Sequence, residues 1–98
     1  MPLKVAILRV TARPWGGRAF GVDETGRELW LKMRAPGQSL GFAHRTAAML
    51  AHSVASAGSP YVIEVEELQV AKVTGQAPKE FMEELAAAFR AYDVRKMR

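Results

Sequence analysis

The sequence predicts an α+β protein: a three-stranded antiparallel meander, a helix, one or two further strands, and a C-terminal helix. Within residues 3–34, three segments alternate apolar and polar side chains, and two turn-forming stretches separate them. Residues 39–57 and 78–93 instead repeat apolar side chains at helical spacing. Residues 61–74 alternate again, but their phase changes after Glu67, which indicates two short strands or one bulged strand.

The length of 98 residues predicts a single domain, 1–98, that ends in a basic tail at 94–98. No run approaches the roughly 18 apolar residues of a membrane span, and the first residues resemble a strand more than a signal peptide. We therefore expect a cytoplasmic protein without a membrane partner. The absence of cysteine excludes disulfides and thiolate metal sites.

The first strand changes its apolar phase between Ile7 and Leu8. A β-bulge at this point would keep the apolar residues on both sides of it facing a core. After the change, Arg9, Thr11 and Arg13 form an outer, polar set.

Trp30 lies on the polar face of the third strand. Strand side chains alternate, so Leu29 and Leu31 share one face. Trp30 shares the opposite face with Glu28, Lys32 and Arg34. A tryptophan among cations is a candidate stacking platform for a nucleic-acid base. Alternatively, a second layer such as a helix covers this face and makes Trp30 part of a core.

Each predicted helix has an apolar stripe. Ser39 is a candidate N-cap of the first helix, whose stripe comprises Phe42, Ala43, Ala47, Leu50, Val54 and Ala57, with Met49 at its edge. The second helix has the stripe Phe81, Leu85, Ala88, Phe89 and Tyr92. This stripe is most simply a core face, but in a barrel that closes its own core it would be free for a partner or a second copy.

Positive charge is concentrated in the first half of the chain. Residues 1–58 contain eight Lys and Arg against three Asp and Glu, whereas residues 59–98 contain six against seven. Such an excess indicates an anionic partner, most often a nucleic acid. Solubility alone also explains a modest net charge of +4.

A meander followed by a helix and closing strands is the order of elements in an OB-fold. The stretch from Gly17 to Asp23, followed by Glu28 to Lys32, resembles the second and third strands of a cold-shock domain. That resemblance implies an OB-like small barrel with aromatic side chains on a nucleic-acid-binding face. The chain departs from the family in having only Phe20 as an aromatic in the second strand, and in its long first helix. An SH3-like barrel and an open sheet with two packed helices remain alternatives.

These patterns predict a protein that binds nucleic acid, with single strands favoured, through the outer face of the meander. Cations would contact phosphates and aromatic rings would stack on bases. The candidate binding residues are Arg9, Arg13, Trp15, Arg18, Trp30, Lys32 and Arg34. The alternative is a protein-interaction module or small regulator that forms a homodimer or docks on a larger protein through its helices.

No pattern indicates an enzyme, a cofactor or a metal site. His44 and His52 are too far apart along a helix to form a metal pair. Glu64 and Glu66 share a strand face, and a third acid would have to converge on them to hold Mg²⁺. More often such acids protect an edge strand from aggregation.

Overall fold

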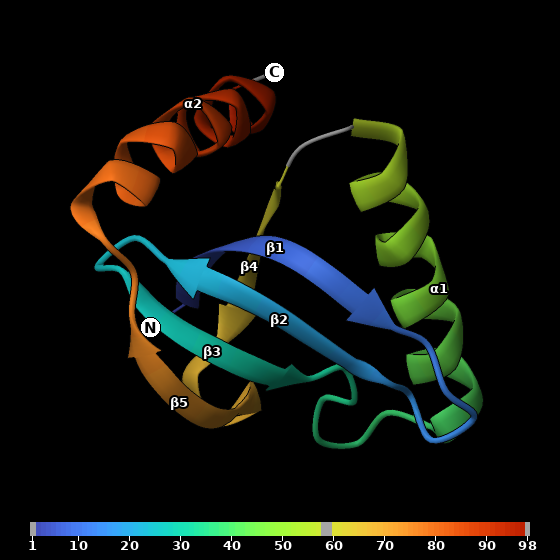
Figure 1. Cartoon of the computed structure of the whole chain (residues 1–98). Helices are drawn as coiled ribbons and strands as arrows, with labels where there is room; N and C mark the ends of the chain where they lie inside the picture. Colours follow the sequence, from blue (N-terminus) through green and yellow to red (C-terminus); the bar gives the residue numbers. More distant parts are fainter. Residues whose placement is uncertain (1, 58–59, 98) are drawn as a thin grey trace.

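The computed structural model describes residues 2–57 and 60–97. Three strands form the meander, a long helix follows, two strands separated by a 3₁₀ turn come next, and a second helix ends the described chain (Figure 1). The elements are β1 (Pro2–Thr11), β2 (Arg18–Asp23), β3 (Arg27–Lys32), α1 (Leu40–Ala57), β4 (Tyr61–Glu66), η1 (Glu67–Gln69), β5 (Val70–Gln76) and α2 (Lys79–Lys96). The predicted α+β class and order of elements are confirmed, and residues 61–74 form two strands.

The strands form one five-stranded antiparallel sheet in the order β4-β1-β2-β3-β5. β4 and β5 follow each other in the chain, yet they pair with different neighbours, β1 and β3, at the two edges of the sheet. Only the three residues of η1 connect them, so the sheet curls and brings these edges near each other. No pairing joins β4 to β5 in the described chain, so the structure corresponds to the open sheet with two packed helices, which was the alternative to the OB-like barrel. No helix within residues 2–57 or 60–97 combines the length and apolar character that crossing a membrane requires.

The predicted bulge in β1 is confirmed. Its pairing with β2 shifts register between Ile7 and Arg9. As a result, Val5 and Ile7 before the shift and Val10 after it all pack in the same core, although the simple alternation is broken there. Arg9 is exposed on the opposite face, as expected.

The two helices pack on opposite faces of the sheet, because Val5 and Ile7 of β1 belong to the core with α1 whereas Ala6 belongs to the core with α2. α1 contributes Ala47 and Leu50 to a core that includes Leu29 and Leu31. The Ser39 hydroxyl accepts a hydrogen bond from the Phe42 amide at 3.1 Å and so caps α1, as predicted. The predicted α1 stripe is partly wrong, because the side chains at its margins, Phe42 and Ala57, are exposed.

α2 covers the outer face at one end of the sheet. Leu85 and Tyr92 are buried against Ala6, Val22 and Val62. The α2 stripe is therefore a core face, as its simplest interpretation predicted, and it is not free for a partner.

The predicted basic tail at 94–98 begins inside α2, which continues to Lys96. Arg95 stabilises this last turn: its guanidinium lies 4.4 Å from the Tyr61 ring centroid and donates a 2.8 Å hydrogen bond to the Val62 carbonyl. Arg98, the end of the predicted tail, lies outside the described residues.

Candidate nucleic-acid interface

Along β2, the outer face of the meander passes from a part that α2 covers to a part that it does not cover. Val22 lies under α2. Phe20, two residues earlier on the same face, instead pairs with Trp30, and their ring centroids lie 5.0 Å apart at an angle of 51°. Trp30 is half-buried and lies beside a pocket rather than under a helix. Of the two predictions for Trp30, the structure favours partial exposure over burial in a helix-covered core.

A row of four side chains crosses this part of the sheet from strand to strand. Arg9 on β1 is the register partner of Phe20 on β2. Phe20 is the partner of Trp30 on β3, and Trp30 is the partner of Lys72 on β5. Directly opposed residues of antiparallel strands point to the same face. The row is therefore an aromatic pair with a cation at each end.

Arg9 also contacts both rings of the aromatic pair. Its guanidinium carbon lies 5.3 Å from the Phe20 centroid and 5.7 Å from the Trp30 centroid. These distances are within the range of cation–π attraction. Arg9 thus covers part of Trp30 and holds the ring against Phe20.

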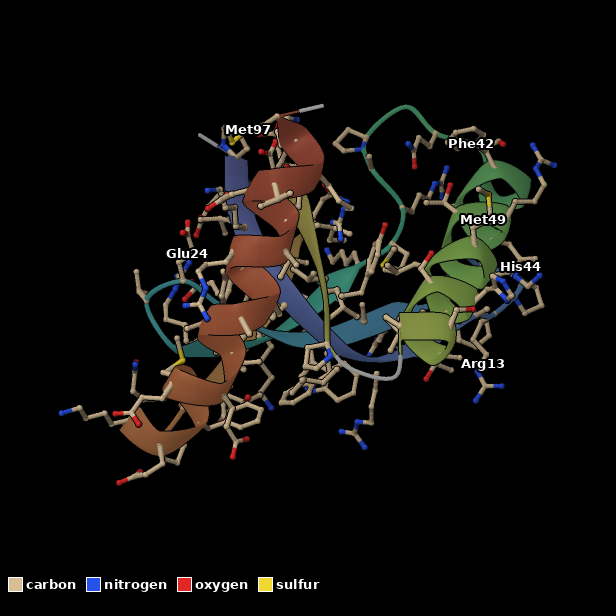
Figure 2. All side chains as sticks on the ribbon, turned by 90° about the horizontal axis from the view of Figure 1, so that it is seen from above. Arg13, Glu24, Phe42, His44, Met49 and Met97 are labelled. Atoms are coloured by element: carbon tan, nitrogen blue, oxygen red, sulfur yellow. The ribbon has the colours of Figure 1, made fainter. Side chains whose placement is uncertain are left out.

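The β1–β2 loop is packed against the first part of α1. The His44 Nδ1 donates a 2.7 Å hydrogen bond to the Arg13 carbonyl, which requires the tautomer protonated at Nδ1. Gly16 packs on Ala43, where a Cβ on the glycine would lie 3.0 Å from the alanine Cβ. Figure 2 shows Arg13 and His44 at this end of the molecule. α1 therefore holds the segment that carries Arg13 and Trp15.

The loop and the Trp30–Lys72 end of the row border an open pocket of about 590 Å³. Trp15, with 57% of its surface exposed, and Trp30 contribute aromatic rings to it. The complete lining is Thr11, Arg13, Trp15, Arg18, Trp30, Ala71 and Lys72. No acidic side chain is in this lining.

The described cations differ in whether they have an acidic partner. Lys4 Nζ, beside α2, donates a 3.0 Å hydrogen bond to Asp93 Oδ1, and this bond raises the pKa of Lys4. Lys96 similarly lies 3.8 Å from Glu64. In the part of the chain that the structure describes, the cations around the pocket form no ion pair; these are Arg9, Arg13, Arg18, Lys32 and Lys72. Their positive charge is therefore not neutralised within the fold.

Comparison of the chain with protein-family models, curated proteins and solved structures finds no match. The function must therefore be inferred from the side chains of this surface.

The structure brings together most of the candidate binding residues from the sequence. Arg13, Trp15, Arg18 and Trp30 line the pocket, and Arg9 packs over Trp30. Lys32 and Arg34 line a separate, shallower hollow of about 310 Å³ with Leu68. The Arg34 Nε donates a 2.9 Å hydrogen bond to the Gln38 carbonyl, so Arg34 also holds its own loop. Lys32 and Arg34 therefore lie outside the lining of the Trp30 pocket.

Sequence reasoning missed Phe20 and Lys72 as members of the site. Phe20 could have been assigned only with the register of β1 and β2, which the bulge shifts. Lys72 lies on a strand whose partner is distant in the chain, and local alternation contains no signal for that pairing.

The described residues contain no group of three or more His, Asp or Glu side chains that could hold a metal ion. Glu64 is engaged with Lys96 instead. His44 is held by the Arg13 carbonyl, while the His52 ring lies 3.3 Å from the Ser56 hydroxyl one turn further along the helix.

Proposed function

We propose that the protein binds single-stranded nucleic acid in the cytoplasm through the Trp30 pocket and the cations around it. One observation supports this most strongly: the half-buried Trp30 lies in a row of side chains with an unpaired cation at each end. Bases stack on aromatic rings while cations contact the phosphates, which is the combination that single-strand-binding proteins use.

A single strand fits this surface better than a duplex does. Stacking on Trp30 requires a base with a free face, and in a duplex both faces of each base are covered by its neighbours. Arginine predominates among the cations, and its planar guanidinium both stacks and pairs with phosphate. The order of elements resembles that of the OB-fold, in which a sheet face often binds oligonucleotides.

The test is a titration of the folded protein with a fluorescently labelled, mixed-sequence single strand at low and moderate salt. We expect saturable binding that weakens steeply with salt. The variants Trp15→Phe and Trp30→Phe leave one tryptophan each, so quenching can be assigned to a ring. Absence of binding at low salt would refute the proposal.

Trp30→Ala should weaken binding by about 1–3 kcal/mol if a base stacks on this ring. Circular dichroism and a urea titration establish that the variant is folded. Phe42→Ala is a matched control, because it removes a half-exposed aromatic ring from α1 outside the pocket. Equal affinities for the folded Trp30→Ala variant and the parent would exclude Trp30 from the interface.

A second candidate function, protein interaction through the helices, is favoured by one region of α1. Phe42 and Met49 project from this helix with 47% and 72% of their surfaces exposed (Figure 2). They border a largely apolar hollow of about 430 Å³ that also contacts Met33, Leu50 and Ile63. Light scattering tests this candidate: a dimer that Met49→Glu dissociates would support it, and a monomer at all concentrations would exclude self-association.

A further inference from the structure

The Trp30 pocket has a volume comparable with that of a site for one small ligand. Its volume of about 590 Å³ lies within the roughly 300–1,000 Å³ of small-molecule sites. Arg9 and Phe20 contact Trp30 but do not line the pocket. Trp30 does line the pocket, and its ring is the surface on which one base would stack.

The charge of the pocket exceeds what one internal nucleotide of a strand would need. Arg13, Arg18 and Lys72 all line it, and within the described residues none of the three forms an ion pair. An internal phosphodiester carries a single negative charge. A phosphomonoester carries about −1.5 to −2 at pH 7 and has three acceptor oxygens. The phosphomonoester complements this set of cations more closely.

We propose that the pocket binds a nucleotide bearing a phosphomonoester, with its base on Trp30 and its phosphate on Arg13, Arg18 and Lys72. This rests on the proposed function and narrows it to the terminal, phosphorylated nucleotide of a strand or to a free mononucleotide. Thr11 contributes a hydroxyl to the same lining and can donate a further hydrogen bond to the phosphate.

The experiment compares three strands of identical sequence: 5′-phosphorylated, 3′-phosphorylated, and with hydroxyl groups at both ends. We expect one phosphorylated strand to bind the full chain about tenfold more tightly than the hydroxyl-ended strand, because hydrogen bonds between charged groups are the stronger kind. Equal dissociation constants for all three would overturn the inference and leave single-strand binding intact. Absence of any strand binding would refute the proposed function.

A mononucleotide, its nucleoside and inorganic phosphate distinguish the two sources of the ligand. Quenching of Trp30 by the mononucleotide, with no binding of any strand, would support the phosphomonoester site and identify a free nucleotide as the ligand. Quenching by the nucleoside as strong as by the mononucleotide would overturn the inference, since the phosphate would then contribute nothing.

Variants test the cations directly. Arg18→Ala and Lys72→Ala should each bring the ratio of the two dissociation constants, hydroxyl-ended strand over phosphorylated strand, closer to one. The affinity for the hydroxyl-ended strand should fall less than the affinity for the phosphorylated strand. Arg90→Ala, which removes an exposed arginine from α2, is the charge-matched control and should leave the preference unchanged. A preference that survives in the folded Arg18→Ala/Lys72→Ala double variant would overturn the assignment of the phosphate to this pocket.

Discussion

Trp30 on β3 and Lys72 on β5 are direct partners across two antiparallel strands, and both side chains line the same pocket. The pairing places a cation beside the only half-buried tryptophan of the described chain. Because β5 forms an edge of the sheet, the Lys72 ammonium group is accessible to a phosphate from outside the fold.

Lys72→Ala should weaken single-strand binding at this surface by a similar factor for every sequence. Loss of one phosphate contact should also reduce the slope of log K against log salt by about 1. Titrations at several salt concentrations measure both effects. Lys79→Ala removes an exposed lysine from the start of α2 and is the control. If Lys72→Ala and Lys79→Ala lower the slope equally, Lys72 contributes only to the net charge and does not contact a phosphate.

His44→Ala should loosen the β1–β2 loop, since His44 donates the hydrogen bond that holds the Arg13 carbonyl. We expect a loss of about 0.5–1.5 kcal/mol in unfolding free energy. In a Trp30→Phe background, the fluorescence anisotropy of Trp15 should also fall. His52→Ala on the exposed side of α1 should change neither quantity. Unchanged Trp15 anisotropy in His44→Ala would show that Gly16 packing alone holds the loop.

Gly17→Ala should be severely destabilising. Gly17 has a φ of +86°, and a Cβ there would collide with the Thr11 carbonyl oxygen of β1. Gly37 has a similar φ of +82°, but a Cβ on it meets open space. Gly37→Ala should therefore cost only the backbone strain of about 1–2 kcal/mol. Urea unfolding compares the two, and equal losses would mean that the Thr11 backbone moves aside.

Asp23 should make the protein less stable in acid. Burial alone would raise its pKa, but hydrogen bonds from Thr25 and Arg27 outweigh burial and lower it. Asp23 Oδ2 accepts a 2.7 Å hydrogen bond from Arg27 Nε, and Oδ1 accepts another from the Thr25 amide at 2.9 Å. A group whose pKa is lower in the folded state contributes stability above its unfolded pKa, about 3.9, and loses it as the pH falls through the folded value.

The measurement for Asp23 is the urea midpoint of the parent and of Asp23→Asn between pH 7 and pH 3. The difference should be constant from pH 7 to pH 5 and should shrink below about pH 4. Glu83→Gln, at an exposed position on α2, serves as the control. A difference that persists unchanged at pH 3 would mean that the charge of Asp23 is not what stabilises the turn.

Local patterns predicted the elements of this fold well. Ser39 caps α1 as its position before an apolar stripe suggested, and the adjacent apolar residues Ile7 and Leu8 correctly located the bulge. Both are short-range effects, in which the conformation depends on a few neighbouring residues. The alternation in β3 likewise placed Trp30 on the opposite face from Leu29 and Leu31.

The features that local patterns did not predict depend on packing between residues that are distant in the chain. Whether Trp30 was covered depended on where α2 lies, and α2 stops short of it. Phe42 sits on the predicted stripe of α1, but a helical wheel does not give the width of the face that the sheet covers. Arg95 extends α2 beyond its predicted end through contacts with Tyr61 and Val62, residues of another strand.

The unpaired cations around the pocket also affect how the protein approaches a polyanion. Ion pairs near α2, such as that of Lys4 with Asp93, cancel charge locally, whereas Arg18 and Lys72 remain uncompensated at the opposite part of the same sheet face. The pocket is therefore a local concentration of positive charge with no acidic side chain in its lining. Attraction between this charge and a nucleic acid should steer their encounter toward the pocket, so that collisions are productive more often than random orientation allows.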